Sequence, residues 1–172
     1  MADDYGVDPL TELPSADDFD ALLAREELRR GRTGELLALA MIDVDGLRRV
    51  NRHHGAGAGT EVLRMCAATL RETLRAVDEI ARVGPDEFAV LLHGTDARNA
   101  NTWANRFEDE LAAVSFEHVA GPVTCSIGIS DTSNGSNLME AAAKAHRRME
   151  VTRTMRKLRR AREGGSEPTG PA

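Results

Sequence analysis

The feature that most constrains the fold is a continuous apolar run over residues 36–42, which leads directly into Asp43. Gly34 lies just before the run, and an acidic turn follows it. A short apolar run between turn signals is typical of a strand that is buried on both faces of a sheet. The sequence therefore predicts a central strand whose C-terminal end presents the carboxylate of Asp43.

Helices are predicted on both sides of this strand. Ser15 can cap a helix together with Asp18, three residues later, and this helix should end near Gly31. Apolar periodicity predicts four further helices, over about 46–53, 62–74, 95–111 and 138–162. Thr95 or Asp96 should open the third of these, and a glycine-rich loop over 55–59 should separate the first two.

The remaining strands are short. Two β-rich runs over 79–83 and 87–92 flank Gly84, Pro85 and Asp86, and this pattern predicts a hairpin with a tight turn. Residues 123–129 alternate in hydrophobicity, as a further strand would. Strands and helices are therefore mixed along the chain.

Charge is distributed unevenly. The 172 residues suit a single domain, and 22 basic against 28 acidic residues give a net charge of −6, which argues against a general nucleic-acid binder. Residues 146–162 contain eight Arg or Lys against Glu150 alone, so this segment carries +7 and the remainder −13. The basic segment is a candidate surface for phosphate or for a protein partner.

Cysteine content and the N-terminus indicate a compartment. Cys66 and Cys125 are too few and too far apart for a disulfide framework or a zinc site. The first twenty residues are acidic rather than basic and then apolar, and no apolar run approaches the roughly 20 residues of a membrane span. We expect a soluble cytoplasmic protein with a flexible leader over 1–7, one domain over 8–162 and a disordered tail over 163–172.

A family resemblance begins in the predicted hairpin, which reads Arg82-Val83-Gly84-Pro85-Asp86-Glu87-Phe88. This stretch resembles the signature of the GGDEF family of nucleotide cyclases, but the family has Gly where this chain has Pro85. Segments 8–14, 42–45 with Asn51, and 123–129 resemble other family motifs. The resemblance covers residues 8–157 and implies an α+β, palm-like fold in which helices surround a central, mostly antiparallel sheet.

Three carboxylates are the candidate metal-binding and catalytic groups. Asp43 at a strand end, with Asp86 and Glu87 at the hairpin tip, offers the oxygen ligands that Mg²⁺ prefers. The resemblance implies that Asp43, the carbonyl of Val44 and Asp86 bind metal, and that Asp86 and Glu87 are catalytic. Two metal ions in such a site activate a ribose 3′-hydroxyl and neutralise the attacked phosphate. The alternative is that these acids are solvated turn residues.

Pro85 is the departure that bears on activity. Glycine allows a positive φ and close approach to a phosphate, whereas proline fixes φ near about −65° and lacks an N–H donor. Proline is accepted at the second position of common turns, so the hairpin should form. The carboxylates that follow Pro85 are expected to be re-aimed, which places cyclase activity in doubt.

The resemblance also implies substrate contacts. It assigns guanine recognition to Asn51 and to residue 60, which is Thr60 where the family has Asp. Losing a bidentate carboxylate contact should weaken guanine preference by about 1–3 kcal/mol, so adenine becomes an alternative base. Arg48, Arg153 and Lys157 are the expected phosphate-side contacts. Thr60 alternatively caps the next helix.

A second nucleotide site is implied before the hairpin. Arg75 and Asp78 form an Arg-x-x-Asp pair, separated from Gly84 by five residues, which resembles the family's inhibitory site for cyclic di-GMP. Arg106 matches a second arginine of that site. Arginine binds phosphate or stacks on guanine, and Asp78 accepts from the guanine edge. The alternative is an exposed ion pair that contributes little.

Three functions follow from these features. We expect a degenerate cyclase domain that binds cyclic di-GMP and acts through protein contacts. The second hypothesis is an active Mg²⁺-dependent cyclase that uses GTP or ATP and makes cyclic di-GMP or an adenine-containing cyclic dinucleotide. The third is a nucleotide-independent interaction module that binds a partner or a second copy through the basic final helix. No nucleic-acid or membrane partner is expected.

Overall fold

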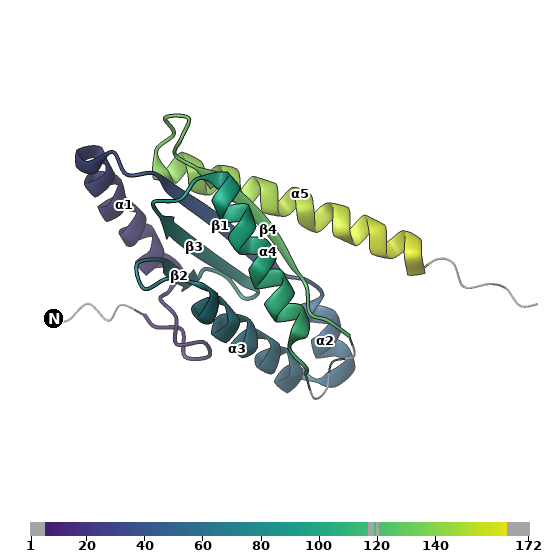
Figure 1. Ribbon diagram of the computed structural model, residues 1–172. Helices are drawn as coiled ribbons and strands as arrows, with labels where there is room; N and C mark the ends of the chain where they lie inside the picture. The colour runs from purple at the N-terminus through teal and green to yellow at the C-terminus, as the bar shows by residue number, and fades with distance from the viewer. Residues whose placement is uncertain (1–5, 117–118, 120, 165–172) are drawn as a thin grey trace, which may run out of the picture.

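A computed structural model describes residues 6–116, 119 and 121–164 of the protein (Figure 1). Four antiparallel strands form one sheet in the order β2-β3-β1-β4. The elements in chain order are α1 (Ala16–Thr33), β1 (Leu37–Val44), α2 (Leu47–His54), α3 (Ala56–Thr73), β2 (Glu79–Arg82), β3 (Glu87–His93), α4 (Ala97–Ala113), β4 (Cys125–Asp131) and α5 (Leu138–Gly164). The predicted α+β class is confirmed.

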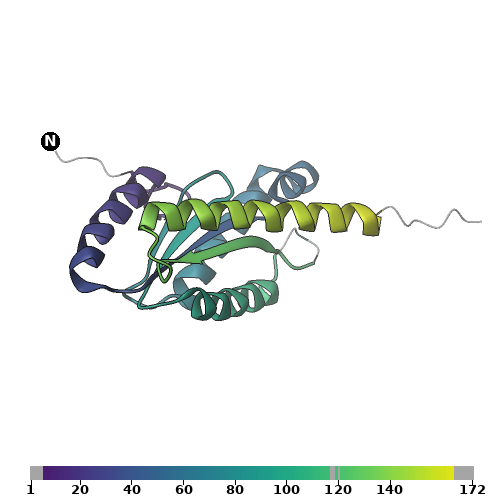
Figure 2. The same cartoon turned by 90° about the horizontal axis from the view of Figure 1, so that it is seen from above.

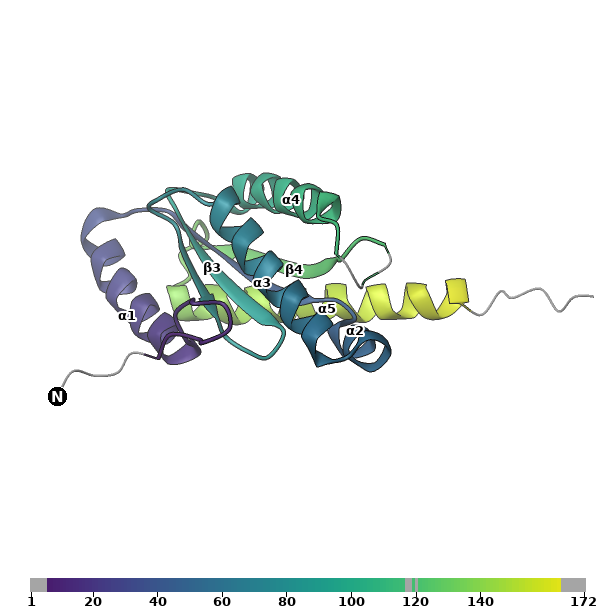
Figure 3. The same cartoon turned by 90° about the horizontal axis from the view of Figure 1, so that it is seen from below.

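Helices cover both faces of the sheet, and strand alternation decides which side chain meets which layer (Figures 2 and 3). On one face, Ala38, Ala40 and Ile42 of β1 belong to a core shared with α3 and α4. On the other face, Leu37 and Leu39 pack in a second core with α1 and α5. The predicted central strand is therefore buried on both sides along its whole length.

The long helix α5 lies very close to β4. A Cβ atom at Gly128 would be 2.1 Å from the backbone oxygen of Ala145 and 2.1 Å from the nitrogen of Met149, so only glycine fits there. This close approach fixes the position of α5 across the sheet. Figure 1 shows that the C-terminal end of α5 continues past the end of the sheet.

Several local predictions are confirmed. Ser15 caps α1 in a capping box with Asp18, and Asp96 caps α4 by accepting from the backbone N–H of Asn99. The hairpin of β2 and β3 forms, although the last strand lies two residues later than expected. The helix α5 continues past Lys157 to Gly164, as expected.

The glycine-rich segment 55–59 differs from the prediction of a loop. Only Gly55, with φ of +84°, separates α2 from α3, and α3 already begins at Ala56. A Cβ at Gly59 would be 1.9 Å from Oδ1 of Asn51, so the glycines allow α2 to pack directly against the first turn of α3. Thr60 therefore lies inside α3, and its alternative role as a helix cap is wrong.

The boundaries of the expected single domain fall partly on undescribed residues. Positions 1–5 of the predicted leader and 165–172 of the predicted tail lie outside the described residues. Helix α5 includes residues 163 and 164, which had been assigned to the tail. Over residues 6–116, 119 and 121–164, none of the helices combines the length and apolarity of a membrane span.

Candidate functional site

The end of β1 and the tip of the β2–β3 hairpin border an open cavity of about 370 Å³. Its described lining combines three carboxylates with three cationic side chains and small or apolar groups: Asp43, Val44, Gly46, Leu47, Arg48, Pro85, Asp86, Glu87, Arg153 and Lys157. The structure therefore brings together the predicted metal and catalytic residues and three of the five predicted substrate contacts.

Strand pairing explains why the three carboxylates converge. Asp43 lies opposite Glu87 in the β1–β3 ladder, and the N–H of Val44 donates to the carbonyl of Asp86 at 2.9 Å. Carboxylate oxygens of Asp43, Asp86 and Glu87 all lie within 4.8 Å of one another. The convergence is a consequence of backbone register.

The turn that contains Pro85 is held in place by Arg82. Nη2 of Arg82 donates to the carbonyl of Pro85 at 2.7 Å, while Nη1 donates to both oxygens of Asp8 at 2.8 and 3.0 Å. Arg82 thereby links the entry segment, before α1, to the hairpin tip. Asp86 and Glu87 reach the cavity with proline at position 85.

Asp43 is the buried charged group of the cavity, since this residue is only 3% exposed. Burial raises the pKa of Asp43, and the nearby charge of Asp86 adds to the shift, although a hydrogen bond from Arg153 opposes it. Nη1 of Arg153 lies 2.9 Å from Oδ2 of Asp43, and its Nη2 lies 2.8 Å from Glu150. A compact set of hard oxygen donors under mutual repulsion fits Mg²⁺, which would relieve that repulsion.

Two predicted substrate residues lie elsewhere. Asn51 and Thr60 are outside the set of described residues that line the cavity. The Asn51 side chain packs on the backbone at Gly59, next to Thr60, so the two residues are neighbours across the α2–α3 contact. Arg48 lies about one helical turn before Asn51 on α2 and lines the cavity.

A second ion-pair group beside the cavity was not predicted. Asp45 accepts from Thr124 at 2.8 Å, from Ser126 at 2.7 Å and from Arg156 at 3.0 Å. Arg156 also contacts Glu108 on α4 at 2.6 Å. The spacing of Arg153 and Arg156 along α5 was the available signal, because residues three apart share a helix face.

The predicted cyclic di-GMP residues lie at the other end of α3. Arg75 binds Asp78 through two bonds, with Nε to Oδ2 at 3.0 Å and Nη2 to Oδ1 at 2.9 Å. The backbone N–H groups of Arg75 and His93 also donate to Asp78, each at 3.0 Å. Arg106 donates to the carbonyl of Thr73, close to Arg75 in the chain.

Exposure distinguishes the members of this group. The side chains of Arg75 and Arg106 are 57% and 58% exposed, whereas that of Asp78 is 2% exposed. Burial opposes ionisation of Asp78, but hydrogen bonds from Arg75 and His93 outweigh it, so the pKa of Asp78 is lowered. Contact between Asp78 and a guanine edge therefore requires the Arg75–Asp78 pair to open.

Comparisons with known proteins agree with this architecture. The family model described as "Diguanylate cyclase, GGDEF domain" matches residues 5–158. Diguanylate cyclase DgcP of Pseudomonas aeruginosa is 40% identical over 125 residues, which are 72% of this chain and 19% of that protein. The chain spans between 19% and 33% of the length of the first curated relatives that it matches.

Solved structures show the same fold. Diguanylate cyclase SiaD of Pseudomonas aeruginosa, in complex with its activator SiaC, superposes with a TM-score of 0.78 at 30% identity, over 86% of this chain and 58% of that one. The GGDEF domain of DgcB from Caulobacter crescentus, in complex with c-di-GMP, gives a TM-score of 0.81 at 22% identity, over 90% and 93%. This chain therefore belongs to the GGDEF domain family of diguanylate cyclases.

Proposed function

We propose that the chain is a degenerate GGDEF domain of cyclic di-GMP signalling, with little cyclase activity of its own, that binds the dinucleotide and acts through protein contacts. The observation that carries this proposal is the ion pair between Arg153 and Asp43, at 2.9 Å. The guanidinium occupies Oδ2 of the buried carboxylate that would otherwise bind Mg²⁺. A tethered cation of this kind competes with a metal ion for the same oxygen.

Two sequence departures support reduced turnover. Pro85 replaces a glycine of the family signature, and Thr60 replaces the carboxylate expected to recognise guanine. When bound, Mg²⁺ would polarise the phosphate under attack and lower the pKa of the attacking hydroxyl. Asp43 and Asp86 would hold the ion, and Glu87, which lies beside them, would accept the proton from the ribose hydroxyl.

A cyclase assay tests this proposal. Purified protein incubated with GTP and either Mg²⁺ or Mn²⁺ should form little or no cyclic di-GMP, as measured by chromatography of the nucleotides. Asp86→Ala, which lacks a candidate metal ligand, is the inactive control for this assay. Robust product that disappears in Asp86→Ala would contradict the proposal and establish the domain as an active cyclase.

The active cyclase remains the second candidate because one observation favours it. Asp43, Asp86 and Glu87 converge in spite of Pro85, beside the cationic side chains of Arg48 and Lys157. The same assay with ATP, alone and mixed with GTP, determines which nucleotide base the domain accepts. An adenine-containing product would identify a cyclase whose base preference follows from Thr60.

For cyclic di-GMP we propose binding through Arg75 and Arg106, with Asp78 orienting Arg75. Both side chains are more than half exposed and lie near the turn that enters β2. Arg75→Ala removes a charge-assisted contact of about 1.5–3 kcal/mol, so calorimetry should show an affinity lower by about ten- to a hundredfold. Arg64→Ala, an exposed change on α3, is the control. Equal binding by Arg75→Ala would disprove this site.

Protein contact is assigned to α5, whose C-terminal end extends past the sheet (Figure 1). Val151, Met155 and Leu158 are exposed on the second half of this helix, next to the basic residues, so the helix offers both apolar and cationic groups. We propose that it binds an acidic partner or a second copy. A variant with all three apolar residues replaced by Ser should have a lower mass by light scattering if α5 binds a second copy, or should fail to capture an acidic partner. Unchanged association would favour another surface.

A further inference from the structure

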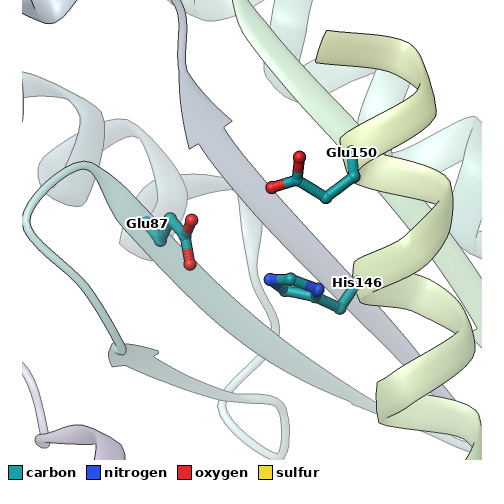
Figure 4. Close-up of side chains that lie close together, drawn as sticks. All are labelled: Glu87, His146 and Glu150. Atoms are coloured by element: carbon teal, nitrogen blue, oxygen red, sulfur yellow. The ribbon is translucent and has the colours of Figure 1, made fainter. Parts of the chain in front are cut away.

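We propose that Glu87, His146 and Glu150 form a binding site for a divalent transition-metal ion of the zinc type, at the edge of the carboxylate cavity, with which it shares Glu87. One ligand atom of each residue lies within 4.8 Å of those of the other two. Figure 4 shows His146 and Glu150 projecting from α5 towards the strand end that carries Glu87. The proposal does not rest on any nucleotide chemistry.

The helix supplies two of these ligands by its geometry. His146 and Glu150 are four residues apart in α5, so their side chains lie on the same face, one turn apart. The contact of α5 with β4 at Gly128, made by Ala145 and Met149, fixes the position of the helix beside the sheet. Glu87 is the first residue of β3, and its place is fixed by pairing with Asp43 of β1. A rigid helix and a rigid strand thus define the site.

The distances are compatible with metal binding after small side-chain rotations. Zinc bonds of about 2.0–2.2 Å place neighbouring ligand atoms about 3–4 Å apart, so atoms within 4.8 Å need to approach by only about 1–2 Å. His146 is exposed and Glu87 and Glu150 are half-buried, so these side chains have room to rotate. Water can occupy the remaining coordination positions from the open cavity.

The donor set selects the ion. Imidazole nitrogen with two carboxylates suits zinc and other first-row transition metals, whereas Mg²⁺ prefers oxygen ligands alone. The neighbouring group of Asp43, Asp86 and Glu87 contains only carboxylates and therefore favours Mg²⁺. Glu87 is common to both groups, so a zinc ion bound to His146 would withdraw Glu87 from the carboxylate cavity.

Arg153 positions one of the three ligands, Glu150. Its Nη2 donates to Glu150 at 2.9 Å while its Nη1 contacts Asp43. Groups that hydrogen-bond to a metal ligand without contacting the metal orient that ligand and tune its charge. Because Arg153 already pairs with two carboxylates, Asp43 and Glu150, and Glu87 lies beside Glu150, the addition of a dication is electrostatically favourable even beside this cation.

Zinc titration tests the site directly. The full chain is titrated with Zn²⁺ by calorimetry, first without Mg²⁺ and then with excess Mg²⁺, which competes for carboxylate-only sites and for the shared Glu87. Co²⁺ serves as a spectroscopic probe. His146→Ala should weaken Zn²⁺ binding by at least about tenfold. Loss of a group that only hydrogen-bonds to a metal ligand already lowers metal affinity by about 10- to 100-fold, and His146 is itself a proposed ligand. Co²⁺ absorption bands that depend on His146 would identify the imidazole as a ligand.

Matched variants separate this site from others. His53→Ala removes an exposed histidine of α2, and Asp86→Asn alters the neighbouring carboxylate group without touching His146 or Glu150. Both should retain Zn²⁺ binding, whereas Glu150→Gln should lose it, with circular dichroism confirming an intact fold in each case. Equal Zn²⁺ affinity in the unmutated protein and His146→Ala, or no binding by the unmutated protein, would overturn the proposal.

Discussion

Two arginine–aspartate pairs, Arg153–Asp43 and Arg75–Asp78, look alike in their contacts. Each has an N–O distance of 2.9 Å, and each carboxylate is almost fully buried. Their titration differs, because the pKa of Asp43 is raised and the pKa of Asp78 is lowered. The pair alone therefore does not determine the charge state of a buried aspartate.

The neighbours explain the difference. Asp78 accepts from two backbone N–H groups in addition to the bidentate guanidinium, so its charge is compensated by fixed donors. Asp43 is buried beside Asp86 and also interacts unfavourably with Asp45. One carboxylate closes a turn, and the other retains a deficit of positive charge that a metal ion can satisfy.

The largest expected effect is the loss of stability on truncating Asp78. Asp78→Ala leaves the backbone N–H groups of Arg75 and His93 without their acceptor, and each buried donor left unsatisfied costs about 1–3 kcal/mol. Asp43→Ala should cost clearly less, because it also relieves repulsion with Asp86. Urea unfolding of both variants measures the difference. Equal losses would mean that the two pairs are energetically equivalent.

The next effect concerns metal affinity at the β1 end. Arg153→Gln frees Asp43 from a charge-assisted hydrogen bond worth about 1.5–3 kcal/mol, so Mn²⁺ should bind about tenfold more tightly or better. Binding is measured by electron paramagnetic resonance of free Mn²⁺. Lys157→Gln is the matched control, since it removes a charge from the same cavity without that contact to Asp43. An equal gain in both variants would attribute the effect to net charge alone.

Reversion of the two departures should strengthen nucleotide binding in the same region. Pro85→Gly with Thr60→Asp restores a backbone donor and a carboxylate acceptor for guanine, for which about 1–3 kcal/mol of GTP affinity is expected. Calorimetry in Mg²⁺ measures the GTP affinity of the double variant and of each single variant. If the double variant binds GTP no better, residues other than these two limit the site, and Arg153 is the first to test.

Local sequence patterns predicted most of the fold because the interactions that set each element are close in sequence. The capping box of Ser15, the hairpin around Pro85 and the buried run that became β1 all depend on neighbours within a few residues. The segment 55–59 was expected to be a loop because glycine disfavours helix. Packing of Asn51 against Gly59 outweighed that tendency, and such a contact cannot be seen from propensity.

The candidate site was predictable in its carboxylates and less so in its cations. The family signature indicated Asp43, Asp86 and Glu87, and strand register brings them together. The pairing of Arg153 with Asp43 joins residues 110 positions apart, so it depends on where α5 crosses the sheet. The burial of Asp78 likewise follows from the tertiary position of His93 rather than from the Arg-x-x-Asp spacing.

The smallest expected effect is a pair of pH dependences with opposite sign. The folded-state pKa of Asp78 is depressed, so its contribution to stability is present above the unfolded-state pKa of about 3.9 and disappears as the pH falls through the folded-state value. The folded-state pKa of Asp43 is raised, so its ionised form carries a penalty at neutral pH that is relieved as the pH falls through that raised value.

Neutral isosteres isolate these two contributions. In urea unfolding between pH 7 and pH 3, the advantage of the unmutated protein over Asp78→Asn should shrink on acidification, because protonated aspartate resembles asparagine. Relative to Asp43→Asn, the unmutated protein should instead gain stability on acidification, and this change should begin at a higher pH than the first. If both differences shrink together over the same pH range, the two aspartates titrate alike, and the contrast between a closed turn and a charge-deficient site fails.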